Sequence, residues 1–340
     1  MTINYFSFMQ CFHGKSYLSS ISPHRSLRKY YFFSRRNFKI SILVFVLIYC
    51  TFSSAVTFAE NLNAGMYGIW ACEDKDQSLK LLADNGFNIV SGVGGKDLLD
   101  KAHKYKIQCL VGAETQLTEE IANDSYRWEK YLKEITQQVK TLKDHPAVFA
   151  WYFVDEPVWG KIPVSKIEEM NGIIRSIDEK HPIYTVLSIP ESWQPYLPLF
   201  DIVAIDPYLR TDESTLEGQP GIVKNWIQKI NNDVNELSGN KPAIWAVLGA
   251  FDLKPKNVRV KASFRKPKPQ EYEEMLDLAI SEQVDGLMIY SIAFTDSEDY
   301  EDWYLPSDDP KLWNVVKRTP NTMESSTITP GCSSGCEPKE

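Results

Sequence analysis

Segments with the pattern of a β-strand alternate with segments of helical period eight times after residue 60. Each strand segment is a short apolar run rich in β-branched and aromatic residues, and in the segments between them apolar residues recur every three or four positions. The predicted strands are residues 65–71, 88–93, 108–113, 148–154, 183–187, 202–205, 243–248 and 286–292. Strands that alternate with helices pair in parallel, and eight such units match a closed barrel better than an open sheet. The sequence therefore predicts an α/β fold, a single (β/α)8 TIM barrel over residues 60–318.

The helical segments carry one apolar face each, as helices that cover a buried sheet should. Residues 125–141 are the clearest case. Their apolar positions are Trp128, Tyr131, Leu132, Ile135, Val139 and Leu142. Segments 167–177, 222–237 and 271–280 follow the same pattern, and 311–316 is predicted to be a short last helix.

Residues 1–59 differ in composition from the rest of the chain. They hold seven Lys or Arg and no acidic residue, and the apolar run 40–49 follows the last of these basic residues. Small residues then lead to Ala59, which completes the order of regions found in a secretory signal. We predict cleavage after Ala59, with Ala55 as the next choice, and export to a secreted or periplasmic location. An uncleaved leader that anchors the protein to a membrane is the alternative.

The tail after Arg318 is polar, rich in Pro and Ser and almost free of apolar residues. Such a composition cannot bury enough apolar surface to offset the entropy of ordering. The sequence therefore predicts three parts: a leader over 1–59, one barrel domain over 60–318 and a disordered tail over 319–340.

The charge balance limits the partners of the protein. The chain has 37 Lys and Arg against 45 Asp and Glu, and the leader holds seven of the basic residues, so the remainder is strongly acidic. An acidic body without a basic stripe argues against nucleic acid, and against a membrane unless the leader is uncleaved. Outside the leader the histidines are His103, His145 and His181. We therefore expect no metal site and no cofactor, and the sequence leaves the oligomeric state open.

The stretch 148–159, VFAWYFVDEPVW, is an apolar strand that ends in two adjacent carboxylates, Asp155 and Glu156. Pro157 follows them and stops the strand, because proline cannot donate to a β-ladder. In a (β/α)8 barrel, a carboxylate at the carboxyl end of a strand lies where active sites are built. The simpler alternative is a strand end capped by two solvated acids.

Other predicted strand ends also carry carboxylates and aromatic rings. Glu156 and Asp206 are the candidates for catalysis, and the candidates for substrate binding are Asp155, Glu114, Trp70, Tyr208, Phe251 and Tyr290. Aromatic rings stack on the apolar faces of sugars, and carboxylates bind hydroxyls and transfer protons. The sequence therefore indicates a glycan or oligosaccharide as substrate.

Simpler interpretations of these residues stay open. Asp206 and Pro207 together are also a common signal for a turn after a strand, and Glu114 is also suited to cap the next helix. Tyr290 suits either the barrel core or a sugar platform. Trp151 and Phe153 alternate with the inward positions of their strand, so we expect them to pack under the helices.

The motif Trp-Tyr-x-x-Asp-Glu-Pro at residues 151–157 resembles clan A of the glycoside hydrolases and its looser relatives. The strand end at 201–208, DIVAIDPY, and Trp313 in the last helix are similar to the same relatives, and the resemblance covers residues 61–318. It implies a (β/α)8 barrel that hydrolyses O-glycosidic bonds and has Glu156 as the acid/base residue.

One position departs from that pattern. Clan members carry a nucleophilic glutamate at the end of strand seven, whereas residues 241–251 of this chain contain no carboxylate, and Gly249 stands near the expected place. Asp206, or an acid of the loop 296–302, can supply the second carboxylate, and for Asp206 we expect the separation of about 6.5 to 9.5 Å that admits an attacking water. The alternatives are a barrel that binds carbohydrate without cleaving it, and another reaction on the same fold.

Overall fold

The computed structural model of the protein describes residues 63–113, 115–252, 264–294 and 301–327. Eight strands make up the main sheet: β1 (Asn63–Met66), β2 (Ile89–Val93), β3 (Gln108–Gly112), β4 (Val148–Tyr152), β5 (Tyr184–Leu187), β6 (Ile202–Ile205), β7 (Ala243–Gly249) and β8 (Gly286–Tyr290). The ends of these strands agree with the predicted ends to within two residues, except that β1 ends earlier than predicted. The predicted leader lies outside the described residues.

The eight strands form a nearly closed parallel barrel. Their order in the sheet is β4-β3-β2-β1-β8-β7-β6-β5, and each neighbouring pair in this order runs in parallel. A parallel bridge between Trp151 and Ile183 connects the two ends of the sheet, and Trp151 N donates to Pro182 O at 2.9 Å. The predicted (β/α)8 barrel is therefore confirmed over the described residues.

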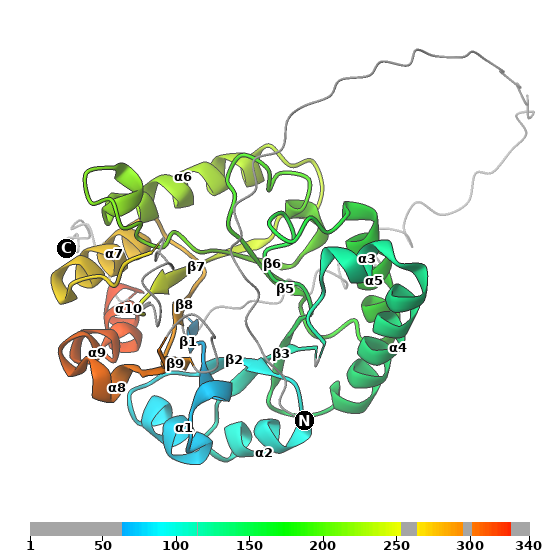
Figure 1. Cartoon of the computed structure of the whole chain (residues 1–340), viewed down its shortest axis with the longest axis horizontal. Helices are drawn as coiled ribbons and strands as arrows, with labels where there is room; N and C mark the ends of the chain where they lie inside the picture. Colours follow the sequence, from blue (N-terminus) through cyan, green and yellow to red (C-terminus); the bar gives the residue numbers. More distant parts are fainter. Residues whose placement is uncertain (1–62, 114, 253–263, 295–300, 328–340) are drawn as a thin grey trace, which may run out of the picture. The chain divides into compact units, whose positions relative to one another are not determined.

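Helices surround the strands, as Figure 1 shows for α1 to α9. The helices are α1 (Lys75–Asp84), α2 (Lys96–Lys104), α3 (Glu119–Asn123), α4 (Ser125–Leu142), α5 (Val164–Ile177), α6 (Gly221–Asn235), α7 (Pro269–Ser281), α8 (Leu305–Asp308), α9 (Pro310–Val316) and α10 (Thr319–Thr327). Short 3-10 helices η1 (Ile69–Ala71), η2 (Leu197–Leu199) and η3 (Leu216–Gly218), and a two-stranded pair of β9 (Ala293–Phe294) and β10 (Trp303–Tyr304), complete the elements. Among the described residues, none of these helices has the length and hydropathy needed to cross a membrane.

Helix α4 shows why the helical segments fold as predicted. Asp124 caps the helix by accepting a hydrogen bond from Arg127 N, which satisfies one of the free amides of the first turn. The buried residues of α4 are Trp128, Tyr131, Ile135, Val139 and Leu142, which is the predicted apolar face without Leu132. On the sheet below, the rings of Trp151 and Phe153 stack at 5.6 Å, and Trp151 Nε1 donates to Asp178 of the loop that follows α5. Both aromatic residues therefore pack outside the barrel, as expected.

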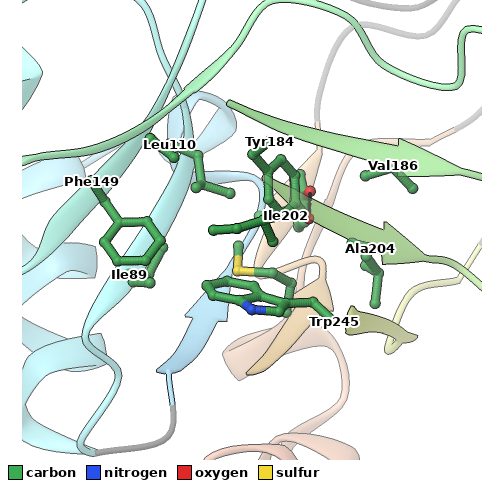
Figure 2. Packing of buried hydrophobic residues seen from close by; sticks show 12 residues of the cluster. Ile89, Leu110, Phe149, Tyr184, Val186, Ile202, Ala204 and Trp245 are labelled. Atoms are coloured by element: carbon green, nitrogen blue, oxygen red, sulfur yellow. Dashed lines mark hydrogen bonds between the residues drawn. The ribbon is translucent and has the colours of Figure 1, made fainter. Parts of the chain in front are cut away.

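The barrel interior is filled by side chains from alternating positions of the strands. Figure 2 shows Phe149, Ile202 and Trp245 pointing into the same space from different strands, and the rings of Phe149 and Trp245 lie 5.7 Å apart. Glycines make room for the largest of these side chains. A Cβ atom at Gly65 would lie 2.1 Å from Sδ of Met288, and one at Gly286 would lie 2.5 Å from the Trp245 ring.

Two predicted boundaries were wrong. The first strand ends at Met66, because Gly68 adopts a left-handed backbone conformation with φ of 91° and η1 begins directly after it. The tail was predicted to be disordered from residue 319, but residues Thr319–Thr327 form α10. Met323 is buried, and the hydroxyls of Thr319 and Tyr272 lie 2.9 Å apart. Pro320 is buried as well, so buried side chains and a hydrogen bond attach this largely polar segment to the barrel.

Candidate functional site

The segment after β4 carries Glu156 at the carboxyl end of the barrel. Neighbouring elements hold its backbone, since Tyr131 of α4 donates to Phe153 O at 2.7 Å and Thr185 of β5 donates to Val154 O at 3.0 Å. Glu156 N itself donates to Val186 O of β5 at 3.1 Å. Glu156 has φ of 42°, an uncommon conformation for a residue with a side chain and one that clusters at functional sites. The sequence predicted the place of Glu156 but not this fixed left-handed backbone.

Asp206 follows β6 at the same end of the barrel. The residue is buried, with 6% exposure. Among the described residues, no N–H or O–H group donates a hydrogen bond to its Oδ1. Tyr208 N donates to Asp206 O at 2.7 Å and closes a tight turn across Pro207. The turn interpretation of Asp206 is therefore confirmed, and the turn fixes the backbone that carries its carboxyl group.

Glu156 and Asp206 form a contact pair of carboxyl groups. Burial is the main reason that the pKa of Asp206 lies well above its ordinary value, and the charge of Glu156, a hydrogen bond with the Glu156 carboxyl and the charge of Asp155 raise this pKa further. Two carboxyl groups can share a hydrogen bond only if one of them is protonated, and the raised pKa of Asp206 favours Asp206 as that group. The contact is closer than the separation of about 6.5 to 9.5 Å that we expected. That expectation was wrong because β4 and β6, although not paired, converge on the same mouth.

Asp155 is a third carboxyl group at this mouth. Tyr152 donates to Asp155 Oδ1 at 2.5 Å. Desolvation by the surrounding protein, followed by the charge of Glu156, raises the pKa of Asp155 to about 7. The hydrogen bond from Tyr152 lowers this pKa by a smaller amount. The residue is nevertheless exposed, so water reaches one side of the carboxyl and screens part of this effect. The mouth therefore combines a proton-sharing pair with a carboxyl group that titrates near neutral pH.

Three of the predicted aromatic residues line the mouth together. The ring centroid of Tyr208 lies 5.0 Å from that of Phe251 and 5.8 Å from that of Tyr290, and Phe251 and Tyr290 are 5.3 Å apart. Burial, followed by the charges of Asp155 and Glu156, raises the pKa of Tyr290, so its hydroxyl stays protonated beside the carboxyl groups. Tyr290 and Tyr208 are half-buried, so they contribute both to the core and to the mouth.

Gly249 lies near the place where clan members carry the nucleophilic glutamate of strand seven, which this chain lacks. It pairs with Tyr290 at the end of β7. A Cβ atom at this position would lie 3.0 Å from the Tyr208 ring and 3.1 Å from the Phe251 ring. These contacts are tight for a Cβ atom, so the aromatic residues occupy the space that a longer side chain would need.

Sequence reasoning missed three tyrosines that support the mouth. Tyr67 and Tyr184 have their hydroxyls 2.8 Å apart in the barrel interior, and the ring of Tyr152 lies 5.0 Å from that of Tyr184. Burial is the largest cause that raises the pKa of each of the three, and the charge of Asp155 raises the pKa of all three further. The sequence signal was present as tyrosines within or next to apolar strands, but aromatic residues are also ordinary strand formers.

The side chains of the two remaining predicted residues are not described. Glu114 lies outside the described residues, and Trp70 is described only in its backbone, which belongs to η1. Among the described residues, no three His, Cys, Asp or Glu side chains are arranged to hold a metal ion. The described site therefore consists of Asp155, Glu156 and Asp206 with the aromatic residues around them.

The chain is similar to known glycosidases. Residues 98–250 match the family described as "Glycosyl hydrolases family 2, TIM barrel domain", and no curated protein sequence matches the chain significantly. A β-D-glucuronidase from Dictyoglomus thermophilum is 14% identical with a TM-score of 0.56, and the match covers 79% of this chain and 50% of that one. A cold-adapted β-galactosidase from Rahnella sp. R3 is 9% identical with a TM-score of 0.60, covering 79% and 57%. A family 2 β-galacturonidase from Eisenbergiella tayi, bound to galacturonate, is 16% identical with a TM-score of 0.56, covering 77% and 51%.

These similarities confirm the predicted resemblance to (β/α)8 barrels of the glycoside hydrolases. The structural matches cover 50% to 57% of the lengths of the three relatives. At these identities they establish the fold, which is a glycoside hydrolase-like barrel.

Proposed function

We propose that this glycoside hydrolase-like barrel cleaves an O-glycosidic bond, with Glu156 as the general acid and Asp206 as the second carboxyl group of the site. The observation that carries the proposal is the contact between these two carboxyl groups at the carboxyl end of the barrel. A general acid must hold a proton near the working pH. A carboxyl pair that shares one proton meets this requirement, because the repulsion between two carboxylates keeps the second from ionising.

The roles follow from where each group lies. Glu156 is half-buried at the rim, so it is the member of the pair that a glycosidic oxygen can reach. Asp206 is deeper, and the one proton of the pair passes to Glu156, which donates it to the leaving oxygen. Asp155 and the hydroxyls of Tyr208 and Tyr290 are proposed to bind sugar hydroxyls, and Phe251 to contact an apolar sugar face.

A second candidate function is carbohydrate binding without hydrolysis. Two observations favour it: the space at Gly249 is occupied by aromatic rings, and the contact between Glu156 and Asp206 is too close for both to flank a glycosidic bond in this arrangement. In this alternative the same residues bind a glycan, and neither carboxyl group transfers a proton to it.

Hydrolysis of a panel of aryl glycosides distinguishes the two functions. The panel includes β-glucuronides, β-galactosides and β-galacturonides, since relatives with this fold bear those names. Glu156→Gln is expected to lower kcat on the order of a hundredfold or more and to leave glycan affinity within a few fold. The loss should be larger for a phenyl than for a dinitrophenyl leaving group, because only the poorer leaving group needs a proton.

The control is Glu179→Gln, an exposed glutamate in the loop before β5, at the opposite end of the barrel. It should keep wild-type rates. Turnover by the wild type that survives Glu156→Gln with every leaving group would remove Glu156 from the mechanism. Glycan binding by the wild type without any turnover would establish the carbohydrate-binding alternative.

We also propose that the protein acts outside the cytoplasm, on the basis of the basic and apolar order of residues 1–59. The mature N-terminus should then fall between Ala55 and Asn61. Sequencing of the N-terminus of exported protein tests this, and a protein that starts at Met1 or Met9 would show that no leader is removed.

A further inference from the structure

Exposed apolar side chains gather at the same end of the barrel as the candidate site. Within the described residues, the large apolar residues with strong exposure are Tyr126 (77%), Trp159 (46%) and Leu216 (45%). Tyr126 lies in the first turn of α4 after β3, Trp159 lies in the loop after β4, and Leu216 lies in η3 after β6. Segments that follow strands belong to the carboxyl end of a barrel. A single exposed apolar residue needs no explanation by itself, so what matters is which of the three lies nearest to the candidate site.

Trp159 is the member of this set that belongs to the same turn as Glu156. Gly160 N donates to Glu156 O at 2.9 Å and closes one turn of helical type, with Trp159 inside it. The turn therefore brings the backbone of Trp159 close to that of Glu156, and Trp159 is 46% exposed.

The turn is held in place by its surroundings. Ile162 N donates to Pro157 O at 2.9 Å, the Ile162 side chain is buried, and Tyr196 donates to Ile162 O at 2.9 Å. Lys161 forms an ion pair with Glu119 of α3 at 3.5 Å. A rigid support of this kind lowers the entropy cost of binding through Trp159, because the ring does not have to be ordered by the ligand.

We propose that Trp159 stacks on the sugar on the leaving-group side of the bond that is cleaved or bound. This inference rests on the proposed role of Glu156. A general acid protonates the oxygen that joins the leaving sugar to the rest of the glycan, so the leaving sugar lies next to Glu156 and farther out of the barrel than the sugar bound at Asp206. A half-exposed indole in the turn that follows Glu156 offers the flat apolar surface that the face of a pyranose packs on.

Binding of oligosaccharides of increasing length tests the proposal without depending on turnover. The probes are β-linked galacto- and gluco-oligosaccharides of one to four sugars, measured by calorimetry against the full chain. Trp159→Ala is expected to weaken binding of the probes with two or more sugars about fivefold or more, on the scale of one aromatic contact, and to leave the single sugar unaffected. Trp159→Phe should restore part of the loss. The matched control is Tyr126→Ala, an exposed aromatic residue outside the Glu156 turn, and it should bind all probes as the wild type does.

If the wild type also hydrolyses glycosides, Trp159→Ala should raise KM for the oligosaccharides and leave kcat/KM for a glycosyl fluoride unchanged, since fluoride has no ring to stack. Equal losses for one sugar and for four, or no loss at all, overturn the Trp159 subsite while the proposed function stands. Failure of the wild type to bind any of the probes overturns the subsite and the glycan-binding function together.

Discussion

Replacement of Asp206 by asparagine tests the shared proton through the stability of the protein. The pKa of Asp206 is raised in the folded state, first by burial and then by Glu156 and Asp155. A carboxyl group of this kind contributes its full stability below its unfolded pKa of about 3.9 and loses it as pH rises toward its folded pKa. The side-chain amide that the substitution introduces does not ionise in this pH range. The stability of Asp206→Asn therefore does not fall with pH for this reason.

The expected size follows from the proton count. While the folded Asp206 is protonated and the unfolded one is ionised, the two states differ by one proton, and the free energy of unfolding falls by about 1.4 kcal/mol per pH unit. As pH rises from 4, the wild type should therefore lose stability relative to Asp206→Asn, by up to about 1.4 kcal/mol for each pH unit until the folded Asp206 ionises. For a domain of this size, each pH unit corresponds to a difference in Tm of about 3 °C. Near pH 4 the two proteins should be within about 1 kcal/mol of each other, because a protonated aspartic acid and an asparagine have similar shape and polarity.

Urea denaturation at pH 4, 5, 6 and 7, with Tm measured in the same buffers, gives the two curves. Asp144→Asn removes the same formal charge from an exposed position and is the control. Its curve should run parallel to that of the wild type. A difference between the wild type and Asp206→Asn that stays constant over this range would refute the raised pKa of Asp206, and with it the proton shared with Glu156.

Two further perturbations address the surroundings of the site. Tyr152→Phe removes the donor to Asp155 Oδ1 and with it the contribution that lowers the pKa of Asp155. The titration midpoint of this carboxyl group, measured by carbon NMR, should therefore move upward from about 7. An unchanged or lower midpoint would contradict the hydrogen bond. Gly65→Ala places a Cβ atom 2.1 Å from Sδ of the fully buried Met288 and 3.1 Å from Ile89 Cβ, so overpacking should lower the free energy of unfolding by about 1 to 3 kcal/mol. Gly172→Ala, on α5 with no atom near the new Cβ, is its control, and equal stability of Gly65→Ala and the wild type would show that the interior has spare room.

The barrel was predictable because its strands are local patterns. Apolar runs such as 202–205 became strands of the same bounds, and Pro157 marked where the stretch after β4 turns away from the sheet. The end of β1 was not predictable in the same way. Residues 67–71 continue the apolar run, and only the positive φ of Gly68, a backbone choice imposed by the packing around it, ends the strand at Met66.

The candidate site was predictable in its members but not in its geometry. Reading the strand ends placed Glu156 and Asp206 on one rim, because the carboxyl ends of parallel strands share an edge. Their contact depends on barrel curvature and on side-chain directions, which no spacing along the chain encodes. The tyrosines Tyr67 and Tyr184 were missed for a related reason. A tyrosine in an apolar strand has the same pattern whether its hydroxyl meets water, another tyrosine or nothing.

The bridge between Trp151 and Ile183 makes the candidate site part of the closure of the barrel. Every other neighbouring pair of strands shares a ladder, whereas β4 and β5 meet through this bridge and through the amides of Trp151 and Glu156. Glu156 follows β4 on one side of this seam, and Asp206 follows β6, which is paired to β5 on the other side. A sugar that contacts both carboxyl groups would therefore cross-link the two edges of the sheet. Its binding energy would add to the energy needed to open the barrel at the place where the backbone alone holds it least.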